Sequence, residues 1–492
     1  TATISVSFIT LAGLPQYVID GNGRVFSLNF GNVADEQSPK MRLLSVSLLE
    51  GLPVFGEAVR VGSPLVRYEY NSSGDLLRVI GRDGNVKRSF GYKNNLMVSH
   101  TDAAGLVSEY EYDHYTPTGK VLRNWTSLGE EWRFTYHDGY TEVTDVLGRT
   151  EQYHYDYNNE LTKRVFADGS THLMERDGLG RLLSYTDAMG RVTRYQYSNE
   201  GQVETIVRPD GAILHFDYDD CYRLIRKSDA EGRYDGYTYD EAGNLLTHTD
   251  PLKHTTRFEY ADNGLLLSVT DPNGSSTAYH YNENHRPDLI TDCSGYETKL
   301  AYTPEGQLAR ITDALGQHTE YHYDADQNLT LALYPDGSKE TFGYDAAGRL
   351  KTHTDGEGHT TSYEYGQDGL PTRRTNALGH TFGYHYDKAR RLIGLTNENG
   401  ARYRFAYDVL DRLIAESGFD HKLTGYRYNA GNELVEQREF GDDASLAAKL
   451  MAQLGGQPIP KKDAAPLSDD LDSQTPLRIT EFKRDILGRL IH

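Results

Sequence analysis

The sequence predicts an all-β fold in which tandem 21-residue β-hairpins join into one continuous antiparallel sheet that spirals into a hollow shell. Three observations carry this prediction. An aromatic-x-Tyr-Asp-x-x-Gly-x-Leu motif recurs along most of the chain, each copy contains two turn signals, and tyrosine supplies 37 of the 492 residues. Tyrosine is a strand-favouring residue. A fixed period of this length is the sequence mark of a repeat architecture, so the period decides the fold.

The second aromatic residue of the motif sets the register of the repeat. It stands at Tyr155, is replaced by Arg176 one period later, and then returns every 21 residues. The predicted structural residues are these tyrosines with the turn glycines and leucines of two model copies: Tyr197, Tyr218, Tyr239, Tyr260, Tyr281, Tyr302, Tyr323, Tyr344, Tyr365, Tyr386, Tyr407, Tyr428, Gly243, Gly348, Leu245 and Leu350.

Each repeat has the length and chemistry of a hairpin with a connecting turn. Side chains alternate along a strand, so Tyr321 and Tyr323 are expected on one face and His322 on the other. Residues 345–348 (Asp-Ala-Ala-Gly) and 355–358 (Asp-Gly-Glu-Gly) are turn signals, because Asp bonds its own backbone and Gly accepts positive φ. Two strands of about six residues and two short turns make about 21 residues.

A parallel β-helix with one coil per repeat is the rival architecture for this period. Such coils have three short strands, whereas this motif has two turn signals and two aromatics two positions apart, which favours the hairpin. Equivalent tyrosines would lie two strands apart, roughly 9.6 Å, so the leucine of the intervening strand is expected to pack between them. Curling the sheet would hide its apolar face and shorten its open edges.

The repeats divide the chain into four stretches. Residues 1–64 are an irregular β region, with a strand-turn-strand pattern at 17–26 and an apolar stretch at 43–54 that is another hairpin or a buried pair of strands. Residues 65–440 carry the repeats. Residues 441–480 are an insertion, and 481–492 start a further repeat with Arg484 at the tyrosine register.

The insertion has two parts and two interpretations. Residues 443–454 have the capping and leucine spacing of a short helix, and 455–478 form a proline-rich linker. One interpretation is a disordered surface loop. The other is a helix held against the mouth or cavity of the shell as a plug or a partner contact.

Composition limits the class of function. A net charge of −21 argues against nucleic-acid binding and favours solubility or a basic cargo. A mean hydropathy of −0.65 suits a thin wall better than one thick core. No run of about 20 apolar residues suggests a membrane span. Cys221 and Cys293 lie about three repeats apart, so free thiols in a reducing cytoplasm are expected rather than a disulfide.

No catalytic, cofactor or metal site is predicted. The turn aspartates follow the period, so a turn role explains them better than a catalytic pair or a calcium loop. Histidines between the tyrosines, such as His154, His322 and His385, belong to strands roughly 9.6 Å or more apart. That distance is too long for them to share one metal ion. The common hydrolase, metalloprotease and nucleotide-binding motifs do not occur.

The motif resembles the YD repeat of the Rhs family. Tyr237–Leu245 (YTYDEAGNL) and Phe342–Leu350 (FGYDAAGRL) match its Y-x-Y-D-x-x-G-x-L pattern closely, and the resemblance covers about 65–440 and 481–492. It implies a spiralling β-sheet shell, a cocoon that encloses the toxin released from the C-terminus of the same polypeptide. The family includes bacterial Rhs effectors carried on type VI secretion spikes, the C components of Tc toxins, and teneurins. The regular repeats look most like the bacterial effectors.

The resemblance implies a non-enzymatic encapsulating shell segment. Its expected partners are the toxin polypeptide inside the cavity, the remaining shell and N-terminal segments, and a type VI spike protein with a chaperone, without nucleic acid or membrane. The protein would be made in the bacterial cytoplasm and secreted into a target cell. The P-D-P-x-G-L-type core with paired aspartates that ends such shells has no match, so self-cleavage and toxin activity are expected outside this stretch.

Two other functions remain open, and a third finds no support in the sequence. A tyrosine-rich surface adhesin that binds carbohydrate would present the aromatic stripes to solvent. A Tc-toxin C-component shell would share the architecture. A polysaccharide-cleaving β-solenoid would need a carboxylate cluster outside the repeat register, and the sequence has none.

Overall fold

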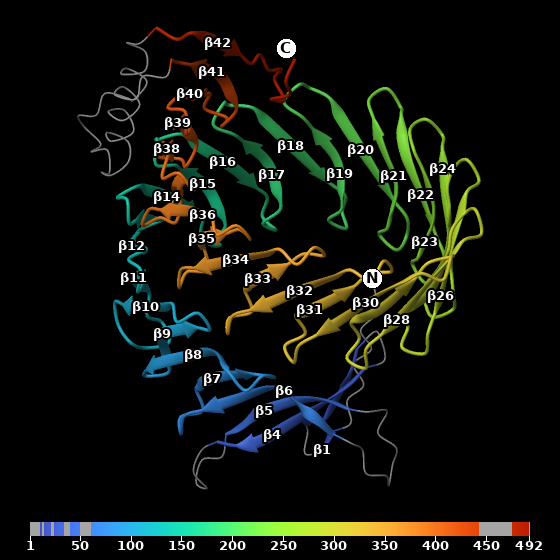
Figure 1. Cartoon of the computed structure of the whole chain (residues 1–492). Helices are drawn as coiled ribbons and strands as arrows, with labels where there is room; N and C mark the ends of the chain where they lie inside the picture. The colour runs from blue at the N-terminus through green and yellow to red at the C-terminus, as the bar shows by residue number, and fades with distance from the viewer. Residues whose placement is uncertain are drawn as a thin grey trace. The chain divides into compact units, whose positions relative to one another are not determined.

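The computed structural model describes residues 10–11, 14–20, 24–33, 40–49, 61–441 and 475–491. In that part of the chain there are strands and no helix, and Figure 1 shows successive strands side by side. Strands β1 (Thr10–Leu11) and β2 (Leu14–Pro15) pair with each other, and β3 to β42 belong to one antiparallel sheet. The predicted all-β hairpin fold is confirmed, and the alternative of a parallel coil is wrong.

The strands before the regular repeats are uneven in length. They are β3 (Tyr17–Ile19), β4 (Val25–Asn32), β5 (Met41–Leu49), β6 (Val61–Tyr70), β7 (Leu76–Gly81), β8 (Val86–Lys93), β9 (Leu96–Asp102), β10 (Val107–Tyr112), β11 (Val121–Thr126), β12 (Glu131–His137) and β13 (Tyr140–Asp145). Residues 17–26 include two paired strands, β3 and the start of β4, as expected, while residues 21–23 between them lie outside the described residues. The described part of 43–54 is one strand, β5, between β4 and β6. The insertion's predicted helix and most of its linker lie outside the described residues.

From β14 onward the strands mostly alternate between six and five residues. They are β14 (Thr150–Tyr155), β15 (Leu161–Val165), β16 (Thr171–Arg176), β17 (Leu182–Thr186), β18 (Val192–Tyr197), β19 (Val203–Val207), β20 (Ile213–Tyr218), β21 (Leu224–Asp229), β22 (Tyr234–Tyr239), β23 (Leu245–Thr249), β24 (Thr255–Tyr260), β25 (Leu266–Thr270), β26 (Ser276–Tyr281), β27 (Pro287–Thr291), β28 (Glu297–Tyr302), β29 (Leu308–Thr312), β30 (His318–Tyr323), β31 (Leu329–Leu333), β32 (Lys339–Tyr344), β33 (Leu350–Thr354), β34 (Thr360–Tyr365), β35 (Pro371–Thr375), β36 (Thr381–Tyr386), β37 (Leu392–Thr396), β38 (Arg402–Tyr407), β39 (Leu413–Ser417), β40 (Leu423–Tyr428), β41 (Leu434–Glu439) and β42 (Arg478–Glu481).

One hairpin shows the geometry that the others repeat. In β30 and β31, Tyr321 pairs with Ala332, a bulge follows His322, and Tyr323 pairs with Leu329. The turn after the strand that ends in the repeat tyrosine is called the first turn, and the turn after the next strand is called the second turn. The bulge lets the tyrosine face the leucine across the first turn, because it takes up the extra residue of the five-against-six pairing.

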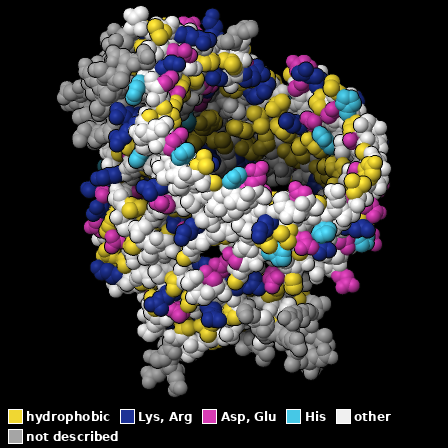
Figure 2. All heavy atoms as spheres, in the orientation of Figure 1, with side chains coloured by type: hydrophobic (Ala, Val, Ile, Leu, Met, Phe, Trp, Pro, Cys, Tyr) yellow, Lys and Arg dark blue, Asp and Glu magenta, His cyan; other side chains and the backbone are white. Residues whose placement is uncertain are grey.

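The sheet has two chemically different faces. The aromatic face carries the second, fourth and sixth residues of the six-residue strands, such as Tyr195 and Tyr197, with Ile206 opposite Tyr195. The polar face carries the residues between them, such as Arg194 and Gln196, which are exposed. Figure 2 shows hydrophobic side chains gathered over β16 to β20.

The core is thin. Among the described residues, apolar side chains that are almost fully buried are few: Val25, Leu49, Ala332, Ala406, Ala415, Leu423 and Phe440. Most residues of the aromatic face are half-buried. A sheet packed against a second layer would bury that face, so the burial pattern indicates a wall one sheet thick.

The chain divides into two compact units. Unit one comprises residues 1–109, 115–118 and 235–369, and unit two comprises 110–114, 119–234 and 370–492. Each unit therefore brings together an early stretch of repeats and a late stretch. These two stretches are called the early layer and the late layer of that unit.

Cys221 and Cys293 are both exposed, with free thiols. No described segment forms a helix that is long and apolar enough to cross a membrane.

Candidate functional site

The repeat tyrosines tie each hairpin to the one before it. The hydroxyl of Tyr323 donates a hydrogen bond of 2.8 Å to the carbonyl oxygen of Leu308, 15 residues earlier. The same bond, from 2.7 to 3.0 Å, is made by Tyr197, Tyr218, Tyr281, Tyr302, Tyr344, Tyr365, Tyr407 and Tyr428. Tyr239, Tyr260 and Tyr386 occupy the same position, opposite Leu245, Leu266 and Leu392.

The two arginines at the tyrosine register replace this bond. The Nε of Arg176 donates to the carbonyl of Leu161 at 3.3 Å, and the Nε of Arg484 donates to that of Leu434 at 3.1 Å. A second nitrogen of Arg176 also reaches the carbonyl of Gly180 at 2.9 Å. The position therefore selects a long side chain with a donor at its end rather than an aromatic ring as such.

In about half of the repeats an aspartate follows the tyrosine and shapes the first turn. Oδ1 of Asp345 accepts hydrogen bonds from the backbone amides of Ala347 at 2.9 Å and Arg349 at 3.0 Å, and Oδ2 accepts from Nε of Arg349 at 2.7 Å. Burial acts to raise the pKa of Asp345, but these hydrogen bonds outweigh it and lower that pKa. The turn closes at Gly348 with φ of 77°, and Gly243 has φ of 92° in its own turn. These values need glycine or a tolerant residue.

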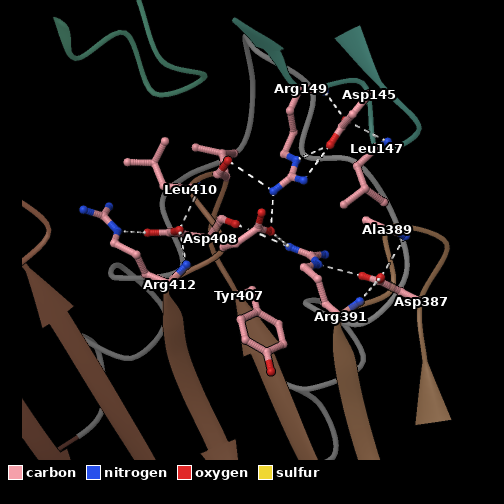
Figure 3. Close-up of polar contacts among 12 residues, drawn as sticks. Asp145, Leu147, Arg149, Asp387, Ala389, Arg391, Tyr407, Asp408, Leu410 and Arg412 are labelled. Carbon is pink, nitrogen blue, oxygen red and sulfur yellow. Dashed lines mark hydrogen bonds and ion pairs between the residues drawn. The ribbon is translucent and has the colours of Figure 1, made fainter. Parts of the chain in front are cut away.

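The turn arginine carries the contact forward to the next hairpin. Arg349 donates to the carbonyl of Gly366 at 2.7 Å, and its guanidinium lies 4.9 Å from the ring centre of Tyr365. Figure 3 shows the same arrangement for Arg391 with Tyr407. Repeats that carry this arginine, such as those of Arg349 and Arg391, thus contact the next repeat through one backbone bond and one cation–π contact as well as the strand ladder.

Charges on the aromatic face occur in pairs 13 residues apart. The Nη2 of Arg164 bonds Oε2 of Glu151 at 2.7 Å. In the same two positions of later repeats, His248 Nε2 lies 3.1 Å from Asp235 Oδ1. His353 Nε2 lies 2.8 Å from Glu340 Oε2. The Arg164–Glu151 pair therefore neutralises its own charges on this face.

A second set of contacts joins the early and late layers within each unit. In unit one, Nζ of Lys87 bonds Oδ2 of Asp326 at 2.6 Å and Oδ2 of its own turn's Asp83 at 2.9 Å. Nearby, Arg82 lies 3.5 Å from Glu305. These side chains are about two-thirds to four-fifths buried, so water screens them less than exposed pairs.

Two junctions of unit two have the base on the early layer, and a third reverses the charges, with Arg390 of the late layer 4.0 Å from Glu130 of the early layer. Arg149 bonds Asp145 of its own turn at 2.5 Å and Asp411 of the late layer, and Asp411 also accepts from Arg391 at 3.1 Å (Figure 3). The guanidinium of Arg191 bonds Asp187 of its own turn and Glu433 of the late layer, both at 2.6 Å.

The Arg191–Glu433 pair is well buried, with side-chain exposures of 17% and 16%. Burial acts to raise the pKa of Glu433, but hydrogen bonds from Asn429 and Arg191 lower it below its ordinary value.

All of these interlayer ion pairs follow one rule. A second turn of the early layer meets a first turn of the late layer, at sequence separations of 223, 239, 242, 260 and 262 residues, or roughly eleven to twelve 21-residue repeats. Sequence reasoning did not find them. A partial signal exists, because three of the early turns carry a base four residues after an aspartate, at Lys87, Arg149 and Arg191.

The contacts described above hold neighbouring repeats and layers together. Among the described residues, no three His, Cys, Asp or Glu side chains are grouped to hold a metal ion. The turn aspartates bond their own turns, as the sequence indicated.

Comparisons with known proteins agree with this structural reading. The family model for the Teneurin YD-shell matches residues 233–342, and that for the RHS Repeat matches 176–213, 344–381 and 367–402. Toxin protein Tse5 of Pseudomonas aeruginosa is 34% identical over 183 residues, which cover 35% of this chain and 14% of Tse5. Double-stranded DNA deaminase toxin A of Burkholderia cenocepacia is 35% identical over 97 residues, or 19% of this chain and 7% of that toxin. The chain spans a small part of both.

Solved structures share the fold. A crystal structure of TcdB2-TccC3 aligns with a TM-score of 0.63 at 13% identity, covering 97% of this chain and 34% of that one. The same complex without its hypervariable C-terminal region gives 0.59 at 15% identity, covering 86% and 26%. At this identity the likeness is one of fold alone.

Proposed function

The chain belongs to the Rhs/YD-repeat family of toxin proteins, and from this premise we propose that it forms part of the wall of a hollow shell. The shell would sequester a toxin polypeptide until delivery into a target cell. The observation that carries the proposal is a sheet one layer thick with an aromatic face that stays half-buried. Such a face is unfavourable in open water over so many strands, and enclosure removes it from bulk solvent.

The contacts suit a wall. A six-residue strand is roughly 20 Å long, so one layer of hairpins makes a narrow band. The interlayer ion pairs connect neighbouring layers through their turns. The backbone hydrogen bonds between strands then continue unbroken along each layer. The paired charges of the aromatic face, such as Arg164 with Glu151, avoid a strong field of one sign beside the enclosed polypeptide.

The proposed partners follow from the family. The enclosed toxin would be encoded by the same reading frame, and further YD-repeat segments would complete the wall. We propose delivery by type VI secretion with a spike protein and a chaperone, after synthesis in the bacterial cytoplasm. This segment would act without catalysis, and cleavage and toxicity would reside elsewhere in the polypeptide. The fold likeness to TcdB2-TccC3 keeps a Tc-type shell as the second candidate.

Protease protection tests the proposal. The polypeptide from the whole natural reading frame is treated with proteinase K before and after denaturation, and surviving toxin fragments are measured by mass spectrometry. Enclosure predicts survival in the native protein and loss in Arg191→Glu, which breaks an interlayer ion pair. Arg233→Glu, a matched change at the same turn position, should keep protection. A toxin digested as fast in the native protein as after denaturation would refute enclosure.

A further inference from the structure

We propose that a pocket in unit two binds an acidic peptide segment of a partner protein, in which apolar side chains lie beside the carboxylates. The pocket has a volume of about 660 Å³, and all of its lining residues belong to unit two. It is lined by residues of two early second turns, 187–190 and 208–211, and of two late first turns, 429–432 and 485–488. The inference goes beyond the proposed shell, because it requires no enclosed toxin.

The first observation is an excess of positive charge at the pocket, in a chain whose net charge is −21. Two carboxylates line the pocket, those of Glu433 and Asp485, and both are occupied. Glu433 accepts hydrogen bonds from Arg191 at 2.6 Å and from Asn429 at 2.8 Å. Asp485 accepts one from Arg489, just after the same turn, at 2.6 Å. Four arginines line the pocket: Arg191, Arg194, Arg208 and Arg484. This excess of positive charge attracts an anion.

The second observation is that two of these arginines are poorly compensated. Arg194 is exposed on the polar face, and none of the described carboxylates lies within ion-pair distance of it. Nη2 of Arg208 lies 3.7 Å from Oδ2 of Asp210, which is longer than a hydrogen bond, and Nε of Arg208 is buried without a hydrogen-bond partner in the described chain. A buried donor without an acceptor is unfavourable, so an acceptor that reaches this guanidinium gains more than it would at a paired arginine.

The turn 208–211 brings Arg208 to the pocket through a departure from the repeat. Arg208 starts this turn, whereas the second turn 187–190 starts with an aspartate. The turn closes without that aspartate, because Oδ1 of Asp210 accepts a hydrogen bond from the amide of Ala212 at 3.0 Å. Folding of the turn therefore does not depend on the side chain of Arg208, which is left for another contact.

Apolar side chains also line the pocket. Val207 of β19 pairs directly with Arg194 of β18, and Val207, Val435 and Phe482 are half-buried. Ile486, in the turn 485–488, is 55% exposed. A free inorganic anion would leave this apolar surface in water, whereas a peptide with apolar residues next to its carboxylates would cover it.

The carboxylates of the pocket select the class of anion. Glu433 and Asp485 repel a phosphate group, whose charge is near −2, more strongly than a single carboxylate. A ligand carboxylate at Arg194 or Arg208 would repeat the contact that Arg191 already makes with Glu433, because the donors of a guanidinium match the two oxygens of a carboxylate. A volume of about 660 Å³ lies in the range of pockets that hold one drug-sized ligand, so it has room for a short peptide.

Fluorescence anisotropy tests the pocket with a labelled acidic pentapeptide, Ile-Glu-Ile-Asp-Ile. A neutral version replaces its acidic residues by glutamine and asparagine. The protein is the polypeptide from the whole natural reading frame, and its variants are Arg208→Gln and Arg194→Gln. Arg233→Gln is the matched control, because Arg233 is 68% exposed and does not line the pocket. Circular dichroism checks that each variant keeps its sheet content.

The acidic peptide should bind the natural protein at least tenfold more tightly than the neutral peptide, because only its carboxylates can form ion pairs with the arginines. Arg208→Gln and Arg194→Gln should each weaken binding of the acidic peptide about tenfold, since each removes a charge-assisted hydrogen bond. Arg233→Gln should bind it like the natural protein. Equal binding by the Arg208→Gln and natural proteins, or no binding of the acidic peptide, would overturn the proposal.

Two further results would overturn it. Displacement of the peptide by inorganic phosphate at an equal concentration would assign the pocket to free anions. Binding by the 492-residue chain but not by the polypeptide from the whole reading frame would assign the pocket to another segment of the same polypeptide. Protection of the toxin from proteinase K is a separate measurement, so failure of peptide binding and failure of enclosure are distinguishable.

Discussion

The interlayer ion pairs make a quantitative prediction at Arg191 and Glu433. A double-mutant cycle replaces each residue by glutamine, singly and together, and measures the free energy of unfolding of the full chain. Glutamine keeps a similar length and removes the charge. The cycle isolates the pair from the effects of each residue on its own turn.

The expected magnitude lies between two limits. Exposed ion pairs contribute about 0–1 kcal/mol, and removal of one partner from a fully buried pair costs about 3–5 kcal/mol. The two side chains are 17% and 16% exposed, with a 2.6 Å contact, so they lie nearer the buried limit. Each single change should cost about 2–3 kcal/mol, and the coupling energy should be about 1–2 kcal/mol.

Arg233 supplies a matched control. It holds the same position after its turn aspartate, bonds Asp229 at 2.7 Å, and is 68% exposed. Arg233→Gln should leave stability close to that of the natural chain, because solvent already screens the guanidinium.

Two assays measure the effects of these substitutions. Urea unfolding followed by circular dichroism gives the free energies, and hydrogen exchange reports the amides of the late turn 429–433. Arg191→Gln should speed exchange in that turn, 242 residues away in sequence. A coupling energy near zero, with unchanged exchange at 429–433, would refute the layered arrangement.

The other predictions concern the repeat itself and pH. The pKa of Glu433 is lowered from its ordinary value of 4.5, so Glu433 stabilises the fold above pH 4.5 and loses this contribution as the pH falls through its folded pKa. Acid titration should therefore destabilise the natural chain more than the Glu433→Gln variant. Tyr323→Phe removes the donor to Leu308 and should cost about 1 kcal/mol in urea unfolding, whereas an equal stability would show that the bond contributes nothing. Gly348→Ala should cost about 1 kcal/mol from positive φ alone, because no neighbouring atom lies within 4 Å, and Gly348→Asn should cost less in the same melt. Arg176→Tyr should be tolerated and Arg176→Ala destabilising in thermal unfolding, and the reverse order would contradict a shared donor role.

The local architecture could be predicted because its causes are local. Alternation of side chains, turn aspartates and positive-φ glycines all act within one repeat, so the hairpin at β30 and β31 follows from a 21-residue stretch. Arg176 can replace the repeat tyrosine for the same reason, because the position needs only a side chain whose donor reaches the carbonyl of Leu161. The leucine expected between tyrosines does lie opposite one, as Leu329 opposite Tyr323.

The contacts between layers could not be predicted because their cause is not local. Which turns meet depends on twist and curvature accumulated over about twelve repeats, and small changes per strand move the partner by a whole repeat. The separations from 223 to 262 residues show that spread. The bases at Lys87, Arg149 and Arg191 mark one side of the junction in the sequence, but their partners are identified only by the fold.

Electron cryomicroscopy of the polypeptide from the whole natural reading frame tests the central claim most directly. The account predicts a wall one sheet thick, with the aromatic face toward an enclosed volume and the turn of Arg191 against that of Glu433. A map in which the aromatic face packs against a second sheet, or lies open to solvent on an extended rod, would contradict it.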